Sequence, residues 1–244
     1  MTTPENNSLS IVLPAYNEEE IIARTVRDLD REVLRHFNDG ELIVVDDCSH
    51  DATLTILKDL EAEIPRLKVL HNRKNLGHGP SLLRGLKSAR YDLVFALDSD
   101  YQHPPADFWK LYPLIDQAAI VTGLRKPRHD PRYRRLLSFC TNLLARRLFS
   151  CPLADLNIPF KLFRAATLDT ILEEIPESCR IPSILIMLTA CKMQVTVEQV
   201  PVRHLPRSTG ECSLPGRRLI LFAAASLKEL LNFHRSQHHR PDSE

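Results

Sequence analysis

The chain has 244 residues, of which 43% are hydrophobic, and its formal net charge is +1. This length can bury one sizeable hydrophobic core, and the balanced charge argues against a general nucleic-acid-binding protein. The six cysteines form no C-x-x-C pair, so we expect reduced, mostly buried thiols rather than a metal site.

Neither terminus has the pattern of a secretion or membrane signal. Residues 1–8 are polar and lack the basic and then apolar order of a secretory leader. The longest apolar candidate, from Leu219 to Leu227, has about half of the roughly 18 residues that a spanning helix needs. We therefore expect a cytoplasmic chain without a transmembrane span.

Strands and helices are predicted to alternate through the first half of the chain. Apolar runs predict strands, and a helix is predicted after each of the first three. Apolar residues at helical spacing indicate the first helix, and Ser49, Asp51 and Thr53 mark the start of the second. This alternation implies right-handed βαβ units and a parallel sheet. The predicted strands cover residues 9–13, 41–47, 67–70 and 93–97, and the helices cover 22–33 and 49–63 and a segment that ends near 89.

The second half continues with a different pattern. Residues 124–135 combine dense positive charge with two prolines, which predicts a loop. We expect one domain over 9–213 between a flexible N-terminus at 1–8 and an amphipathic helix at 214–236. The further predicted elements are helices at 106–117, 133–149, 168–175, 183–192 and 216–234, strands at 119–123, 158–164 and 195–204, and a disordered tail at 237–244.

Two carboxylates follow the fourth predicted strand directly. Asp98 and Asp100 stand at its carboxyl end with Gln102 behind them, where ligands bind in open α/β sheets. Their oxygen atoms suit a hard divalent cation that also holds phosphate. The alternative is that these residues merely cap a helix that starts near Pro104. Because parallel strands end at one edge, we expect Pro14, Tyr16, Asp47 and Asp100 to share a cleft.

Four stretches in this order carry a resemblance to a known family. They are Pro14-Ala-Tyr-Asn-Glu18, Val45-Asp-Asp-Cys-Ser-His-Asp-Ala-Thr53, Asn75-Leu-Gly-His-Gly79 and Asp98-Ser-Asp-Tyr-Gln-His-Pro-Pro105. Together they resemble the successive motifs of family 2 glycosyltransferases with the GT-A fold. The last stretch looks most like that of dolichyl- and polyprenyl-phosphate mannose and glucose synthases. The resemblance covers about residues 9–215 and implies an α/β, Rossmann-like fold with a mostly parallel sheet.

The resemblance implies which residues bind the sugar donor. Asp47 is expected to accept a hydrogen bond from a base N–H, and Asp98 to face the ribose or the sugar. Asp100 and Gln102 are expected to hold Mg²⁺ or Mn²⁺. The other expected donor contacts are Pro14, Tyr16 and Glu18 in the nucleotide pocket, Ser99 beside the aspartates, and Arg207 at the diphosphate.

The same resemblance implies an acceptor-phosphate site. Arg125 ends a Gly-x-Arg element, and Arg134 and Ser138 lie in a Tyr-Arg-x-Leu-x-Ser-like element. Asp98, Asp100 and Arg125 are the expected catalytic residues. The sequence departs from the family pattern at Gly210-Glu-Cys-Ser213, where many members have a lysine in place of Ser213.

These residues predict a metal-dependent inverting glycosyltransferase. It moves a hexose of the mannose or glucose type from a GDP- or UDP-sugar to a polyprenyl phosphate at the cytosolic membrane face. One alternative is transfer to a saccharide or protein hydroxyl, for which Asp155 is the candidate base. Another is a non-catalytic nucleotide-sugar-binding regulator. The last helix fits core packing, a homo-oligomer interface or peripheral membrane binding.

Overall fold

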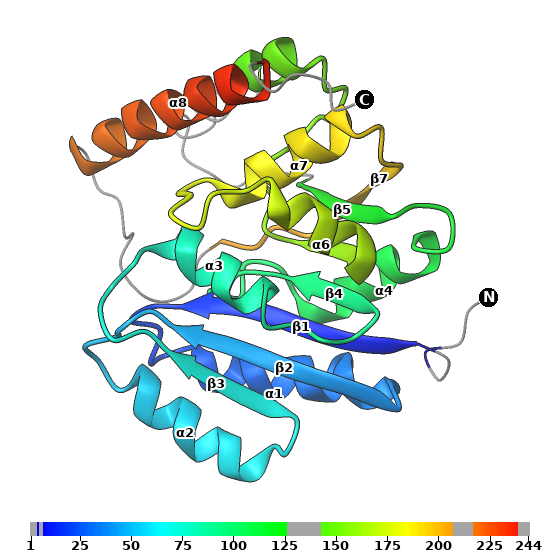
Figure 1. Ribbon diagram of the computed structural model, residues 1–244. Coiled ribbons are helices and arrows are strands. Elements are labelled where there is room, and N and C mark those ends of the chain that lie inside the picture. Colours follow the sequence, from blue (N-terminus) through cyan, green and yellow to red (C-terminus); the bar gives the residue numbers. More distant parts are fainter. Residues whose placement is uncertain (1–3, 5–6, 126–142, 207–216, 239–244) are drawn as a thin grey trace.

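The computed structural model describes residue 4 and residues 7–125, 143–206 and 217–238 (Figure 1). Its core is a seven-stranded sheet in the order β3-β2-β1-β4-β6-β5-β7. The predicted parallel α/β arrangement is confirmed for the first four strands. The strands are β1 (Ser8–Ala15), β2 (Asp39–Asp46), β3 (Leu67–His71), β4 (Leu93–Ala96), β5 (Ile120–Arg125), β6 (Lys161–Arg164) and β7 (Val197–Val202).

Strand β6 departs from the parallel pattern. It runs antiparallel to both of its neighbours, β4 and β5, whereas β5 and β7 are parallel to each other. The sheet is therefore mostly parallel. An apolar run shows that a strand is buried but carries no information on its direction.

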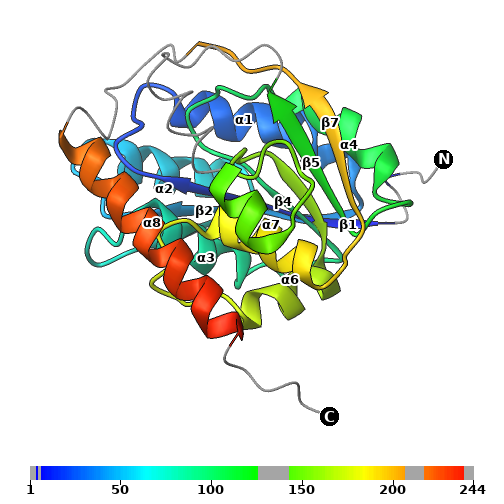
Figure 2. The ribbon, with the colours of Figure 1, turned by 90° about the horizontal axis from the view of Figure 1, so that it is seen from above.

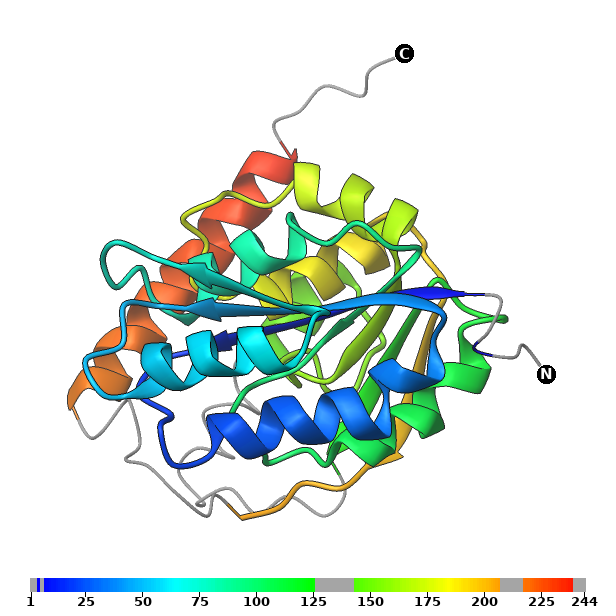
Figure 3. The ribbon, with the colours of Figure 1, turned by 90° about the horizontal axis from the view of Figure 1, so that it is seen from below.

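Helices cover both faces of the sheet and define two hydrophobic cores. Along β1, Ile11 and Leu13 contribute to one core and Val12 to the other, because successive side chains point to opposite faces. Figure 3 shows α1 and α2 together on one side of the sheet, and Figures 1 and 2 show α3, α6 and α7 on the other. The helices are α1 (Ile22–Glu32), α2 (Thr53–Glu63), α3 (His78–Leu86), α6 (Ala165–Glu173), α7 (Pro182–Lys192) and α8 (Arg217–His238).

The helix predicted at 106–117 is broken into short pieces. A 3-10 turn at Pro105–Asp107 precedes α4 (Phe108–Leu111), and another 3-10 turn follows at Tyr112–Leu114. Pro113 explains the break, because proline has no backbone N–H to continue an α-helix.

The cysteine expectation is wrong for one pair. Cys151 and Cys191 form a disulfide that joins the segment after a helix at residues 143–149 to the end of α7. Cys48 and Cys179 are free thiols, as expected. The two bonded cysteines are 40 positions apart, so no short-range spacing in the sequence predicts that they pair.

Helix α8 packs on the outer side of the core that contains α3, α6 and α7 (Figures 1 and 2). Leu230 and Phe233 are buried, and the ring of Phe233 stacks on that of Phe149 with centroids 6.0 Å apart. Leu221 and Leu227 remain 70% and 41% exposed. Among the helices that the structure describes, none is both long and apolar enough to cross a membrane.

Candidate active site

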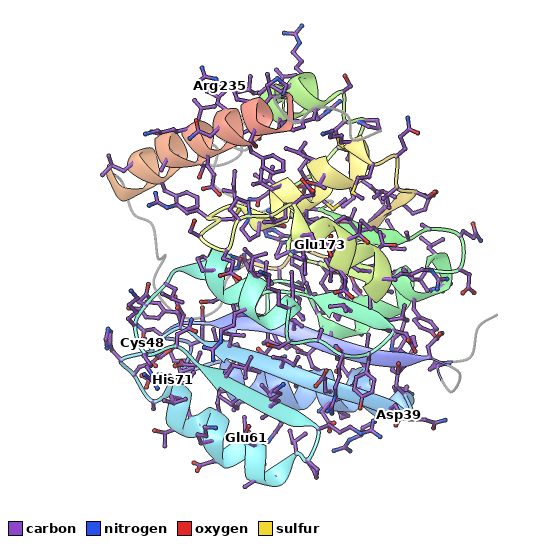
Figure 4. The ribbon with its side chains drawn as sticks, in the orientation of Figure 1. Asp39, Cys48, Glu61, His71, Glu173 and Arg235 are labelled. Carbon is purple, nitrogen blue, oxygen red and sulfur yellow. A yellow bond between two sulfur atoms is a disulfide. The ribbon has the colours of Figure 1, made fainter. Side chains whose placement is uncertain are left out.

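The sheet brings the predicted site residues to one edge. β1, β2 and β4 are parallel to one another. β6 is antiparallel to both β4 and β5, so β5 runs in the same direction as β4. Their carboxyl ends therefore lie at the same edge. Cys48 and His71 lie at this edge and Asp39 at the opposite one (Figure 4). Ligands of open α/β sheets bind beyond this edge.

The loops after β1 and β2 are joined by hydrogen bonds from backbone N–H groups to side-chain oxygens. The Asn17 N–H donates to Ser49 Oγ at 3.0 Å, and the His50 N–H donates to Asn17 Oδ1 at 2.9 Å. The Glu18 N–H donates to Thr53 Oγ1 at 2.8 Å. Asn17 and Cys48 have positive φ angles of 52° and 61°, so both loops turn sharply here.

The predicted nucleotide-pocket residues sit on these loops. Pro14 and Glu18 are buried, whereas Tyr16 is half-buried and its ring lies edge-on to that of His50 at 6.2 Å. Tyr16 is therefore not a core aromatic. It presents part of a flat apolar surface at the carboxyl edge.

Asp47 holds the loop that leads into α3. Its Oδ1 accepts hydrogen bonds from Asn72 Nδ2 at 2.8 Å and the Leu76 N–H at 2.9 Å. Its Oδ2 accepts one from the Gly77 N–H at 2.8 Å. Gly77 has a φ of 92°, which explains the glycine at the turn. Asp47 thus fixes the shape of the loop. Because its carboxylate already accepts these three hydrogen bonds, the predicted contact with a nucleotide base has to use its remaining lone pairs.

The acidic loop after β4 is held in shape by hydrogen bonds to other elements. Asp100 Oδ1 accepts the Gln102 N–H at 3.1 Å, across Tyr101, whose φ is 59°. The carbonyl of Ser99 accepts a hydrogen bond from Thr25 in α1 at 3.0 Å. The Gln102 side chain donates to the Leu205 carbonyl at 3.1 Å. The loop is therefore fixed on both sides before any ligand binds.

The alternative of a helix cap is not supported. The 3-10 turn that starts at Pro105 has no side-chain capping hydrogen bond. Instead, Asp100 and Gln102 offer carboxylate and amide oxygens, the ligand types that Mg²⁺ and Mn²⁺ accept. Within the described residues no group of three His, Cys, Asp or Glu side chains forms a complete metal site. The donor set therefore fits a cation whose remaining ligands come from a bound diphosphate and water.

His78 contacts the acidic loop and was not predicted as a site residue. Its Nε2–H donates to Asp98 Oδ1 at 2.8 Å. The His78 side chain is 52% exposed. Partial desolvation by the surrounding protein favours neutral His78, but the charge and hydrogen bond of Asp98, with smaller effects of Asp100 and Asp47, raise its pKa. Burial likewise favours neutral Asp98, but His78 lowers the pKa of that carboxyl. Protonated His78 and ionised Asp98 thus stabilise each other.

We expect this pairing to be visible by NMR. The histidine ring of His78 should titrate above its ordinary pKa of 6.5, and Asp98→Asn should bring it back toward that value. Because the folded-state pKa is raised, the stabilisation is fully present below 6.5 and is lost as the pH rises through the folded pKa. An unchanged His78 titration in Asp98→Asn contradicts the pairing.

Arg125 and Asp155 form a buried ion pair. Arg125 Nε donates to Asp155 Oδ2 at 2.8 Å, and its Nη2 donates to Oδ1 at 3.0 Å. The side chains are 10% and 5% exposed. The structure therefore joins the predicted acceptor-phosphate arginine to the candidate base of the hydroxyl-acceptor alternative. Arg134, Ser138 and Arg207 lie outside the described residues.

Two residues at the site escaped the sequence predictions. His78 belongs to the motif Asn75-Leu-Gly-His-Gly79, and its contact with Asp98 spans 20 positions. Lys161 is 2% exposed at the start of β6. The presence of Lys161 in a predicted apolar strand could have indicated a special role, because lysine is almost never fully buried without partners.

Solved structures share this fold. Glucosyl-3-phosphoglycerate synthase from Mycobacterium tuberculosis, solved with Mn²⁺ and UDP-glucose, has a TM-score of 0.67 and 20% identity, with 98% of this chain and 81% of that chain covered. S. aureus TarS 1-349, solved with UDP, has a TM-score of 0.60 and 21% identity, with 97% and 67% covered. The described fold is therefore the GT-A fold that the sequence motifs implied.

Curated relatives are more similar in sequence. Two undecaprenyl-phosphate 4-deoxy-4-formamido-L-arabinose transferases from Pseudomonas fluorescens, strains Pf0-1 and SBW25, are 29% and 30% identical over 215 and 218 residues. Each alignment covers 87% of this chain, but this chain spans only 62% and 61% of those relatives. The family model described as "Glycosyl transferase family 2" matches residues 10–172, and the chain thus belongs to that family.

Proposed function

We propose that this protein transfers a sugar from a nucleoside-diphosphate sugar to a polyprenyl phosphate. The observation that carries the proposal is one edge of the sheet that holds two polar groups, with β6 between the strands that carry them. The loop that carries Asp100 and Gln102 follows β4. Arg125, which forms the buried ion pair with Asp155, ends β5. The first suits a diphosphate held through a cation, and the second lies where an acceptor phosphate can approach.

The donor half of the mechanism concerns the leaving diphosphate. A divalent cation bound there supplies Lewis-acid stabilisation of the charge that accumulates as the anomeric bond breaks. Asp100 and Gln102 would hold the cation, and Asp98, whose carboxyl pKa His78 lowers, would face the sugar or ribose. The half-buried ring of Tyr16 packs against the nucleotide. Attack from the side opposite the diphosphate inverts the anomeric centre, as expected for this family.

The acceptor half needs no strong general base. A phosphate monoester with a second pKa near 6 is already a competent nucleophile at neutral pH. A hydroxyl acceptor needs a carboxylate base, but both Asp155 oxygens accept hydrogen bonds from Arg125. That engagement favours the phosphate acceptor over a saccharide or protein hydroxyl. The names of the Pseudomonas fluorescens relatives, which act on undecaprenyl phosphate, support the same choice.

The test is a transfer assay with a panel of donors. Purified protein with Mn²⁺ or Mg²⁺ and polyprenyl phosphate is incubated with UDP- and GDP-linked glucose and mannose, the hexoses we propose, and with an aminoarabinose-type donor. Lipid-linked sugar supports the proposed function. Donor binding without turnover on any acceptor instead supports the regulator alternative, and product on a saccharide or peptide hydroxyl supports the other alternative.

We also propose that α8 attaches the protein to the cytosolic membrane face, where such an acceptor resides. Leu221 and Leu227 are exposed, and Lys228 follows Leu227 directly in the sequence. The double change Leu221→Ser and Leu227→Ser is expected to reduce co-flotation with anionic liposomes several-fold. Met193→Ser, which removes another apolar residue that is 42% exposed, is the control. Undiminished flotation of the double variant contradicts this role for α8.

A further inference from the structure

Helix α8 contacts the connection between α6 and α7 through a glutamate. Glu229 lies on α8 and is half-buried. Its Oε1 accepts a hydrogen bond from the Arg180 N–H at 2.9 Å. Arg180 belongs to residues 174–181, which connect α6 to α7. Figure 1 shows this connection, in yellow-green, between α3 and α8. Glu229 therefore holds a segment that lies against another helix.

The neighbouring residue Cys179 binds the same carboxylate. Cys179 is 1% exposed, and its thiol forms a hydrogen bond with Glu229. Burial, and after it this hydrogen bond, raises the pKa of the thiol, so that the thiol stays protonated and can donate. The Cys179 N–H donates to the Pro176 carbonyl at 2.9 Å. Two consecutive residues of the connection thus depend on one side chain of α8.

The backbone of these two residues packs directly against the start of α3. Gly79 is the second residue of α3, and a Cβ at this position would overlap the Cys179 carbonyl oxygen and lie 2.8 Å from Arg180 Cα. The glycine is therefore needed for the close approach of the two backbones. On the other side, the Gly77 N–H is held by the aspartate that follows β2. His78 lies between these two supports.

The side chain of His78 depends on this backbone support. It is 52% exposed, so packing alone does not fix it, and its ring donates to Asp98 at 2.8 Å. A shift of the first turn of α3 by about 1 Å would stretch this hydrogen bond beyond the range in which such bonds form. The contacts of Glu229 oppose such a shift, because they hold the segment on which Gly79 rests.

We propose that Glu229 positions His78 for its hydrogen bond with Asp98 and so connects α8 to the donor side of the active site. The expected effect on transfer rests on the proposed function, in which Asp98 faces the sugar or ribose, whereas the expected effect on His78 does not. Glu229 is a positioning residue, because it acts through Arg180 and α3 and not on a substrate. A purely structural glutamate would attach α8 and leave His78 unaffected.

The first test is NMR of the His78 ring, whose signals are assigned by their loss in His78→Gln. Glu229→Ala removes both acceptor oxygens, so the ring signals should move toward their positions in Asp98→Asn, in which the pairing is absent. Glu229→Gln keeps an oxygen that can accept from the Arg180 N–H, and its signals should stay near those of wild type. Unchanged His78 signals in folded Glu229→Ala would overturn the inference.

Glu177→Ala is the matched control. Glu177 lies in the same connection and is 86% exposed, and its ion pair with Lys87 joins the connection to the other end of α3. The His78 signals should not move in this variant, because exposed ion pairs contribute little. If Glu229→Ala does not fold, Glu229→Asp decides. It keeps the charge but shortens the side chain by one methylene, and unchanged His78 signals in this variant would equally overturn the inference.

The transfer assay gives the second readout. The donor KM of Glu229→Ala is expected to rise about 5-fold, while its acceptor KM stays within about 2-fold of wild type, because Asp98 is placed on the donor side. A wild-type donor KM, or an equal rise of both KM values, would overturn the connection to the donor side. No lipid product from wild type with any donor would instead refute the proposed function, and the His78 signals would still test the positioning role.

Discussion

Asp100→Ala is expected to lower the rate of sugar transfer by at least about 10³-fold, because it removes the only carboxylate that we assign to the cation. The protein should remain folded. The side chain is half-buried, so the loss of stability should be about 1 kcal/mol, the usual cost of a single substitution. Turnover by the purified variant and its melting temperature check both statements.

Asp92→Ala is the matched control for this change. Asp92 is also an aspartate next to β4, but it precedes the strand and accepts a hydrogen bond from Ser8 Oγ at 2.8 Å at the opposite edge of the sheet. Its removal should leave turnover within about 2-fold of wild type, since surface changes usually cost less than about 0.5 kcal/mol. Turnover that survives in Asp100→Ala would contradict the assignment of Asp100.

Arg125→Met is expected to show the largest loss of stability together with the loss of activity. The change leaves Asp155, which is 5% exposed, as a buried charge without its bidentate partner. Removing one partner of such a pair costs about 3–5 kcal/mol. Acceptor use should fall with it, because the guanidinium that we propose for the acceptor phosphate is gone. Chemical unfolding and the acceptor KM measure the two effects.

The double variant Arg125→Met with Asp155→Leu separates stability from function. Replacing both charges by apolar groups should restore most of the free energy of unfolding but none of the activity. Arg27→Met is the control, since Arg27 and Glu63 are 52% and 55% exposed at 2.8 Å, and such surface pairs contribute about 0–1 kcal/mol. An active double variant would contradict the acceptor role of Arg125.

The local patterns in the sequence predicted the elements that build the donor side. The apolar runs before Pro14, Asp47 and Asp98 are strands, and because those strands are parallel, their polar ends meet at one edge. Residues 22–33 were predicted as a helix from apolar spacing alone, and α1 ends one residue earlier. Here each prediction needed only neighbouring residues.

Contacts between distant segments could not be predicted in the same way. The direction of β6, the Cys151–Cys191 disulfide and the His78–Asp98 hydrogen bond depend on how elements pack, which no spacing records. The ion pair of Arg125 with Asp155 spans 30 positions, and it changes the role that can be assigned to each of the two residues. A resemblance to a family names such residues separately but does not say that they touch each other.

The most direct test of the central claim is the binding of Mn²⁺ to the purified protein, followed by electron paramagnetic resonance with and without UDP or GDP. We predict that wild type binds Mn²⁺ much more tightly when the nucleoside diphosphate is present, because the diphosphate completes the ligands that Asp100 and Gln102 begin. Asp100→Asn should lose this enhancement. Equal Mn²⁺ binding by wild type and Asp100→Asn in the presence of nucleotide would contradict the site described here.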